Sequence, residues 1–157
     1  MIYFQAEEKN IKTPLEMFYH WEKSNPHGVY LKQPVKGQWT TYTWSEVGNH
    51  VRRMAAALKA KNYPAGSHIA ICSKNCAHWI MADLAIWMAG HVSIPLYPNL
   101  NNATVTKILD HSESKLCFLG KLDDWKEIQK GIPKDMPLIA FPYEPRENSE
   151  SWDDLIS

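Results

Sequence analysis

The sequence predicts an α/β protein with a doubly wound, mostly parallel sheet flanked by helices and an N-terminal β-hairpin. Between residues 68 and 141, short apolar runs typical of buried strands alternate with segments of helical periodicity. Ahead of them, a stretch rich in β-forming residues is split by the Lys-Gly pair at 36–37. Helices between successive apolar strands favour right-handed crossovers, which make the strands parallel.

The first helix is predicted to begin after Thr13. Thr13 suits an N-cap, Pro14 suits the first helical position, and Glu16 completes a capping box. The helix is expected to end near Asn25, because the residue before a proline avoids helical backbone angles.

A hairpin is predicted over residues 29–43. Lys36-Gly37 supplies its turn, and residues 39–43 are Trp-Thr-Thr-Tyr-Thr, a β-forming run. Pro34 restricts the first strand to a sheet edge, because proline has no N–H to donate.

A second capping box, Thr43 with Glu46, starts a long helix. Its apolar residues recur at helical spacing and predict one buried stripe. That stripe comprises Val47, Val51, Met54, Ala55 and Leu58. Residues 61–66, Lys-Asn-Tyr-Pro-Ala-Gly, are expected to end the helix.

Strands and helices then alternate. The predicted strands are residues 68–72, 91–95, 115–120 and 136–141. The intervening helices are expected to start at Asn75, to follow an Asn102 cap, and to surround Trp125 and Ile128.

The alternation is expected to stop at residue 141. Residues 142–150 form a polar, proline-bearing linker, so the predicted core is 13–141. Ser151 and Asp154 then signal a new helix, but fewer than two turns follow, too few for a stable helix alone. We therefore expect residues 1–157 to be the N-terminal part of a larger domain in a polypeptide that continues.

Composition excludes several functional classes. Of the 157 residues, 45% are hydrophobic and 22% charged, as in soluble globular proteins. Lys plus Arg and Asp plus Glu both number 17, which disfavours nucleic-acid binding. The most apolar run, 79–90, is too short to span a bilayer. Residues 1–10 lack an apolar export core, so we expect a cytoplasmic protein, with peripheral membrane contact left open.

Cys72, Cys76 and His78 lie close together in the sequence and raise the question of a metal or redox site. A structural zinc site needs a second ligand pair, and the chain adds only Cys117. A redox role stays open for Cys76, because a helix N-terminus lowers a thiol pKa. The favoured interpretation is that the cysteines act as small buried hydrophobes.

The sequence contains neither a P-loop nor a G-x-G-x-x-G phosphate motif, and it has no G-x-S-x-G nucleophile elbow. The paired acids Asp123-Asp124 and Asp153-Asp154 fall at helix starts, where the helix dipole explains them. No residue is therefore predicted to be catalytic, cofactor-binding or metal-binding.

Three blocks of the chain resemble core segments of the AMP-forming acyl-CoA synthetases, members of the adenylate-forming enzyme superfamily. They are TYTWSEVGNHVRRMAAAL (41–58), KNYPAGSHIAICSKN (61–75) and WMAGHVSIPLYPNL (87–100), in the family's order and spacing. With the weaker segment DHSESKLCFLG (110–120), the resemblance covers most of residues 13–120.

Details are similar to the long-chain fatty acid–CoA ligase branch. Asn75 followed by Trp79 matches that branch's N-x-x-x-W, and PLYPNL (95–100) resembles its P-L-Y-P-T-L. The sequence departs from the pattern at Asn99, where that branch has threonine, and from the wider family's pattern at Asn62 and at Ser67-His68.

The resemblance implies a parent enzyme that activates a fatty acid with ATP and Mg²⁺ to acyl-AMP and then transfers it to coenzyme A. In the family the phosphate loop and the adenine, ribose and lysine motifs lie downstream of the segments matched here, so this chain alone is expected to be inactive. If the parent enzyme has a ligand surface on this piece, doubly wound geometry places it around Ser73–Asn75 and Tyr97–Asn99, at the strand ends. The favoured alternative is that Asn75 is only an N-cap and Pro95 and Pro98 only stiffen a loop.

Two alternatives stay open. The chain is a stand-alone doubly wound binding or interaction module, or the parent ligase acts on a shorter or aromatic acid. If the chain is a fragment, an exposed apolar docking surface is expected to promote self-association.

Overall fold

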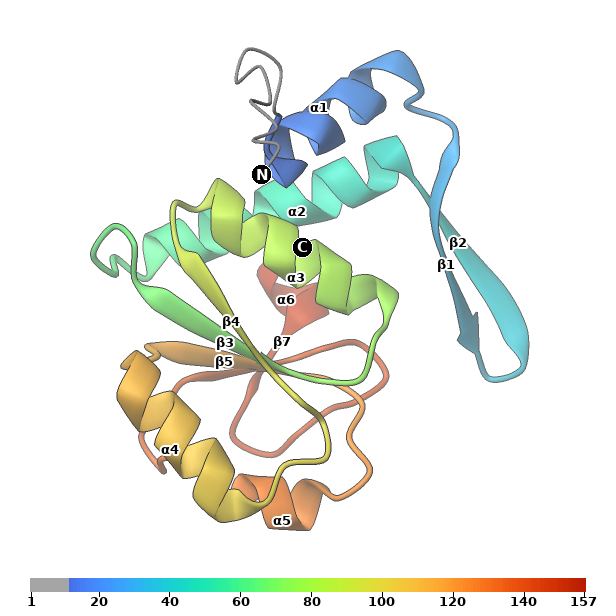
Figure 1. The fold of residues 1–157 in the computed structure, drawn as a ribbon. Coiled ribbons are helices and arrows are strands. Elements are labelled where there is room, and N and C mark those ends of the chain that lie inside the picture. Colours follow the sequence, from blue (N-terminus) through green and yellow to red (C-terminus); the bar gives the residue numbers. More distant parts are fainter. Residues whose placement is uncertain (1–11) are drawn as a thin grey trace, which may run out of the picture.

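The computed structural model describes residues 12–157. The N-terminal stretch without an apolar export core, residues 1–10, lies outside the described residues. The described chain forms a two-stranded hairpin and a five-stranded sheet with helices on both faces (Figure 1). This architecture confirms the predicted fold class.

The first helix and the hairpin match their predictions. Helix α1 spans Pro14–Ser24, and Thr13 and Glu16 form the expected capping box. Strands β1 (Val29–Val35) and β2 (Gln38–Thr43) pair antiparallel. Lys36 and Gly37 both have positive φ, at 48° and 81°, the backbone that a two-residue hairpin turn requires.

Helix α2 (Trp44–Ala60) begins at the second predicted capping box. The Thr43 Oγ1 accepts a 3.2 Å hydrogen bond from the Glu46 N–H, and the Glu46 carboxylate accepts one of 2.7 Å from the Thr43 N–H. The five residues of the predicted stripe are all buried.

The main sheet has strand order β4-β3-β5-β6-β7, and every neighbouring pair is parallel. Its strands are β3 (His68–Cys72), β4 (Val92–Leu96), β5 (Leu116–Leu119), β6 (Leu138–Ala140) and β7 (Glu150–Ser151). The remaining helices are α3 (Ala77–Met88), α4 (Asn102–Ser112), α5 (Trp125–Gln129) and α6 (Trp152–Leu155).

Two hydrophobic clusters fill the two sides of the sheet. The larger joins α1, α2, α3 and α6 to one face, and the smaller joins α4 and α5 to the other. Figure 1 shows α2, α3 and α6 above the sheet and α4 and α5 below it. Successive side chains of β3 point to opposite faces of the sheet. Ile69 and Ile71 pack in the larger cluster, and Ala70 and Cys72 pack in the smaller one.

Two predicted helix starts were wrong by one or two residues. Asn101, not Asn102, caps α4: its Oδ1 accepts the Thr104 N–H at 2.9 Å. Helix α3 starts at Ala77 with Cys76 at the N-cap, not at Asn75. There the Ala77 N–H donates to Gln33 Oε1 of the hairpin at 2.7 Å, so a distant side chain supplies the cap.

The end of the chain also differs from prediction. Glu150, assigned to the linker 142–150, belongs to β7, a fifth strand that pairs with Ile139 and Ala140 of β6. Helix α6 has only four residues, yet Trp152 is 0% exposed in the larger cluster. A helix of this length is unstable alone, and tertiary burial of one indole stabilises this turn within the fold.

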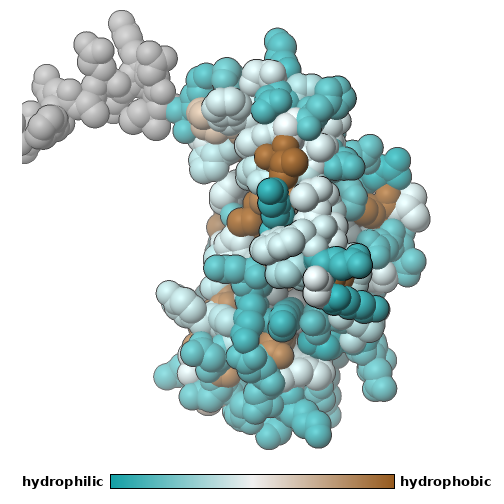
Figure 2. Space-filling model, turned by 90° about the vertical axis from the view of Figure 1, so that its right-hand side faces the viewer, coloured by the Kyte–Doolittle hydropathy of each residue, from teal (hydrophilic) through white to brown (hydrophobic). Residues whose placement is uncertain are grey.

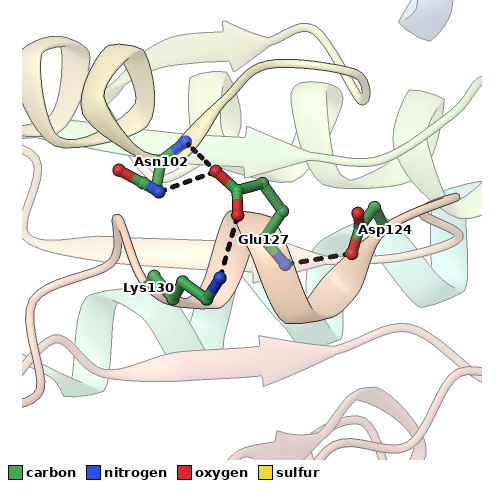
Figure 3. A network of polar contacts seen from close by, with 4 residues as sticks. All are labelled: Asn102, Asp124, Glu127 and Lys130. Carbon is green, nitrogen blue, oxygen red and sulfur yellow. Dashed lines mark hydrogen bonds and ion pairs between the residues drawn. The ribbon is translucent and has the colours of Figure 1, made fainter.

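Glu127 connects α5 to the start of α4 (Figure 3). Its Oε1 accepts from the side-chain amide of Asn102 at 2.6 Å, and its Oε2 pairs with Lys130 at 3.1 Å. Asp124 caps α5 by accepting the Glu127 N–H at 3.0 Å. Each charged group here except the Asp124 carboxylate has an ionic partner within the network, so the cluster is structural.

The surface is mixed in character. On the face shown in Figure 2, hydrophobic side chains lie singly between hydrophilic ones. None of the helices in the described part of the chain combines the length and apolar content needed to cross a membrane.

Candidate functional site

The candidate site lies at the carboxyl ends of β3, β5 and β6. If the five strands of the main sheet are numbered along the chain, with β3 as the first, their order in the sheet is 2-1-3-4-5. The connections that follow β3 and β5 therefore cross to opposite faces of the sheet. In open α/β sheets this switch point opens a crevice for ligands.

The loops after these strands are in close contact. The Lys74 N–H donates to Lys121 O at 2.8 Å, and the Gly120 N–H donates to Cys72 O at 3.1 Å. A Cβ at Gly120 would lie 2.2 Å from the Ser73 Oγ, so the two loops meet where only glycine fits.

A pocket of about 340 Å³ opens beside this contact. The tip of the hairpin forms one wall, and the loops after β3, β5 and β6 form the other. The lining residues are Gln33–Lys36, Asn75, Cys76, His78, Lys121 and Phe141–Glu144.

His78 is the buried polar group of this pocket. It is 3% exposed, with its ring edge-on to Tyr42 and to Trp152, at centroid distances of 5.9 and 5.3 Å. Burial, with a smaller contribution from His50, lowers the pKa of His78 to about 4. The imidazole is therefore neutral at pH 7, so one ring nitrogen carries a proton that it can donate and the other can accept a hydrogen bond.

The three cysteines do not come together with His78. Cys72 and Cys117 pack in the cluster on the α4/α5 face, whereas Cys76 and His78 lie on the α3 side. Burial raises the pKa of Cys72 to about 11 and that of Cys117 well above its ordinary value. Within residues 12–157, no three His, Cys, Asp or Glu side chains gather as a metal site would require.

Cys76 caps α3 through its backbone, but its thiol is not activated. Burial raises its pKa, and the Trp79 N–H, the Ser73 hydroxyl and the His78 N–H oppose this only in part. The structure thus favours the interpretation of these thiols as buried hydrophobes over a redox pair.

The residues named for a possible ligand surface lie in two separate places. Asn75 lines the pocket, and Ser73 is buried beside it with its Oγ donating to Lys74 O at 2.7 Å. Tyr97 follows the edge strand β4, is 77% exposed and does not line the pocket. Asn75 is not the N-cap that the favoured alternative required.

The paired acids have the structural roles that the sequence indicated. Asp123 forms an ion pair with Lys74, and Asp124 caps α5. Asp153 and Asp154 lie in the first turn of α6.

Sequence reasoning missed most of the pocket wall. Gln33 and Lys36 belong to the hairpin, and Tyr143 and Glu144 belong to the predicted linker. Nothing in their local sequence marks them, because only the fold brings these segments to one sheet edge.

A larger hollow of about 750 Å³ lies between α5 and residues 145–148. Its most basic group, Arg146, lies 5.1 Å from the Trp125 ring centroid, donates to Gly120 O at 3.1 Å and pairs with Glu144. These contacts engage only one terminal nitrogen of the guanidinium, and the buried Arg146 Nε has no hydrogen-bond partner among the described residues. We regard the smaller pocket as the better candidate because it lies at the switch point between β3 and β5.

Residues 18–153 match the family model described as AMP-binding enzyme. The chain is 29% identical over 102 residues to the long-chain-fatty-acid–CoA ligase FadD15 of Mycobacterium bovis, covering 65% of this chain and 17% of that protein. It is also 29% identical over 138 residues to long chain acyl-CoA synthetase 2 of Arabidopsis thaliana, covering 83% and 21%. The chain thus spans about a fifth of the length of these relatives.

Solved structures share the fold. The anthranilate CoA ligase AuaEII superposes with a TM-score of 0.79 at 16% identity, covering 90% of this chain and 27% of that one. A benzoate CoA ligase from Burkholderia xenovorans superposes with a TM-score of 0.76 at 16% identity, covering 93% and 28%.

Proposed function

We propose, since this chain belongs to the AMP-binding enzyme family, that it forms the N-terminal part of the large domain of an AMP-forming acid–CoA ligase. The observation that carries the proposal is the family match over residues 18–153, together with relatives several times longer than this chain. The parent would join a carboxylate to the α-phosphate of ATP, releasing pyrophosphate, and the thiol of coenzyme A would then displace AMP.

We further propose a long-chain fatty acid as the acid. Both sequence relatives described above carry a long-chain name, and the PLYPNL and NCAHW segments resemble that branch. The aromatic-acid ligases are similar in fold at 16% identity, which supports the shared architecture and not the substrate.

The described residues fit a scaffold better than a catalytic centre. Mg²⁺ is held through carboxylates and substrate phosphates, and residues 12–157 hold no cluster of acidic and other ligating groups. We therefore assign ATP, Mg²⁺ and coenzyme A to the parent enzyme and no catalytic step to this chain.

Extending the reading frame tests the proposal. We expect a phosphate loop of the T-S-G-T-T-G-x-P-K-G kind within several dozen codons after Ser157, and ATP–pyrophosphate exchange with palmitate from the extended protein. Residues 1–157 alone serve as the control and should give none. A stop codon directly after Ser157 would instead favour a stand-alone binding module.

The choice of acid is tested on the same extended protein. Palmitate is expected to give a higher kcat/KM than benzoate or butyrate. A preference for benzoate would reassign the substrate to the aromatic acids without changing the reaction.

Association and location stay predictions. We expect residues 1–157 to self-associate at high concentration and to be cytoplasmic, with peripheral membrane contact open. Trp21, Trp39 and Tyr97 are exposed apolar groups on separate elements. Sedimentation velocity over a concentration series measures the first property.

A further inference from the structure

We propose that residues 142–149 form a strap beside the candidate pocket, that Arg146 holds this strap closed, and that the strap opens as a unit while the sheet stays folded. Pro142, Tyr143 and Glu144 form part of the pocket wall, so the strap controls access to the pocket. This motion requires no ligase activity, and it can therefore be tested apart from the proposed function.

Both ends of the strap are fixed in the core. Before the strap, Phe141 is 3% exposed, and its N–H donates to Leu119 O at 2.8 Å. After the strap, β7 pairs with β6, and the Trp152 side chain is fully buried. The residues between these two anchors can therefore move without moving the sheet.

Arg146 joins the strap to the rest of the fold. Its Nη2 donates to Gly120 O at 3.1 Å, and its guanidinium carbon lies 5.1 Å from the Trp125 ring centroid. In the described part of the chain, every other hydrogen bond of residues 142–148 stays between residues 141 and 149. A single side chain therefore carries the hydrogen bonding between the strap and the sheet.

The closed strap contains a strained residue. Tyr143 follows Pro142 in a turn that is closed by the hydrogen bond from the Glu144 N–H to Phe141 O, at 3.2 Å. The φ of Tyr143 is 70°, a left-handed angle that a type II turn requires at this position and that glycine or asparagine usually supplies. Because Tyr143 is 55% exposed, burial of its own side chain does little to offset the strain.

The contact that Arg146 makes is incomplete. Both of its side-chain hydrogen bonds use Nη2, and its buried Nε has no partner among the described residues. A buried donor without an acceptor is costly, and opening of the strap would let water bond to it. The strain at Tyr143 and this unpaired N–H both favour release, so the closed strap is held by a small margin.

Open space borders the strap along its length. The hollow of about 750 Å³ borders residues 145–148, and the candidate pocket of about 340 Å³ borders residues 142–144. A third hollow of about 340 Å³ lies between the strap and Ala140, Ser151 and Asp153. A segment with so few packing contacts loses little when it moves, and its release would join these spaces.

Cleavage of the full chain by a glutamyl endopeptidase, followed by mass spectrometry, reports the opening. The bond after Glu147 lies inside the strap, and the rate of its cleavage follows the population of the opened segment. Arg146→Met removes the donor to Gly120 O and should speed this cut about tenfold, the loss expected for a hydrogen bond from a charged group. Lys126→Gln, at an exposed position on α5, is the matched control and should be cut as the parent is.

Tyr143→Asn should have the opposite effect and slow the cut about threefold, because asparagine adopts left-handed angles at lower cost. Tyr97→Asn, at another exposed tyrosine, should leave the rate unchanged. If Arg146→Met does not fold, Tyr143→Asn carries the test alone.

Two further measurements on Arg146→Met separate opening of the strap from unfolding of the chain. Cys76 lines the candidate pocket, so its reaction with an aromatic disulfide reagent should also become about tenfold faster. The β5 amides of Phe118 and Leu119 should keep their protection against hydrogen exchange.

The proposal is overturned if Arg146→Met is cut and labelled at the rates of the parent, or if Tyr143→Asn is cut faster than the parent. It is also overturned if Arg146→Met lowers the protection of β5 by the same factor by which it speeds the cut. Arg146 would then support the whole fold and not the strap.

Discussion

The imidazole of His78 lies edge-on to the indole of Trp152, with ring centroids 5.3 Å apart and planes at 87°. This contact joins the first turns of α3 and α6, whose residues are 74 positions apart. It places the last described helix against the helix that lines the candidate pocket. Two of the predictions below depend on it.

Trp152→Ala should lower the free energy of unfolding by about 3–5 kcal/mol, because it removes a fully buried indole from the larger cluster. Urea denaturation followed by circular dichroism measures this change. Trp39→Ala is the control, since Trp39 is 71% exposed and its loss should cost no more than about 0.5 kcal/mol. Equal losses in the two variants would contradict the burial of α6.

Stability should fall as the pH drops from about 6.5 toward 4. The pKa of His78 is about 4 in the folded chain, below the ordinary histidine pKa of 6.5, so between these pH values the unfolded state binds more protons. The contribution of neutral His78 to the free energy of unfolding is fully present above pH 6.5, and on the order of 3 kcal/mol of it is lost by pH 4. Burial also lowers the pKa of His50, which adds in the same direction.

His78→Phe should remove most of this pH dependence, measured by urea midpoints at several pH values. His27→Gln, at an exposed position, should keep the full slope. A His78→Phe slope equal to that of the parent would show that other groups cause the acid sensitivity.

Thr43→Ala should cost about 1 kcal/mol of stability, because the capping box of α2 loses the Oγ1 that accepts the Glu46 N–H. The same change raises the pKa of Glu46, which hydrogen bonds from Thr43 now lower. Thermal unfolding measures the first effect and carboxyl NMR titration the second. Thr41→Ala, on the same strand and exposed, is expected to leave the Glu46 pKa unchanged.

Gly48→Ala should be nearly neutral, although alanine in a helix normally gains about 1 kcal/mol over glycine. The added Cβ would lie 1.8 Å from a carboxylate oxygen of Glu22, which must move and give up its pair with Arg52. In a Glu22→Ala background the same substitution should stabilise by about 1 kcal/mol. Equal effects in both backgrounds would argue against this close approach of α1 and α2.

The native protein should show no fast-reacting thiol pair in a titration at pH 8. Burial raises the pKa of all three cysteines, and the Cys72 and Cys117 side chains are buried in the smaller cluster. Cys76, which is only partly buried, should react first but slowly, and Cys76→Ser should abolish that phase. All three thiols should react in denaturant. Two rapid equivalents in the native protein would restore the redox hypothesis.

The candidate pocket could not be read from the sequence. Asn75, Cys76 and His78 stand together in one segment that the sequence marks, but Gln33 and Tyr143 come from distant segments with no local signal in common with it. The role of Cys76 as N-cap also escaped prediction, because Gln33, 44 residues from Ala77, supplies the capping oxygen.

The sequence by itself determined both capping boxes, the hairpin turn at Lys36-Gly37, the buried stripe of α2 and four strands of the main sheet. Each of these depends on residues at most a few turns apart, so periodicity and capping chemistry are sufficient. Only the tertiary structure decided that Glu150 and Ser151 form a fifth strand, that Trp152 stabilises a four-residue helix, and that the hairpin closes the pocket. Those outcomes depend on burial and hydrogen bonds between distant segments, and a short window of sequence does not encode such contacts.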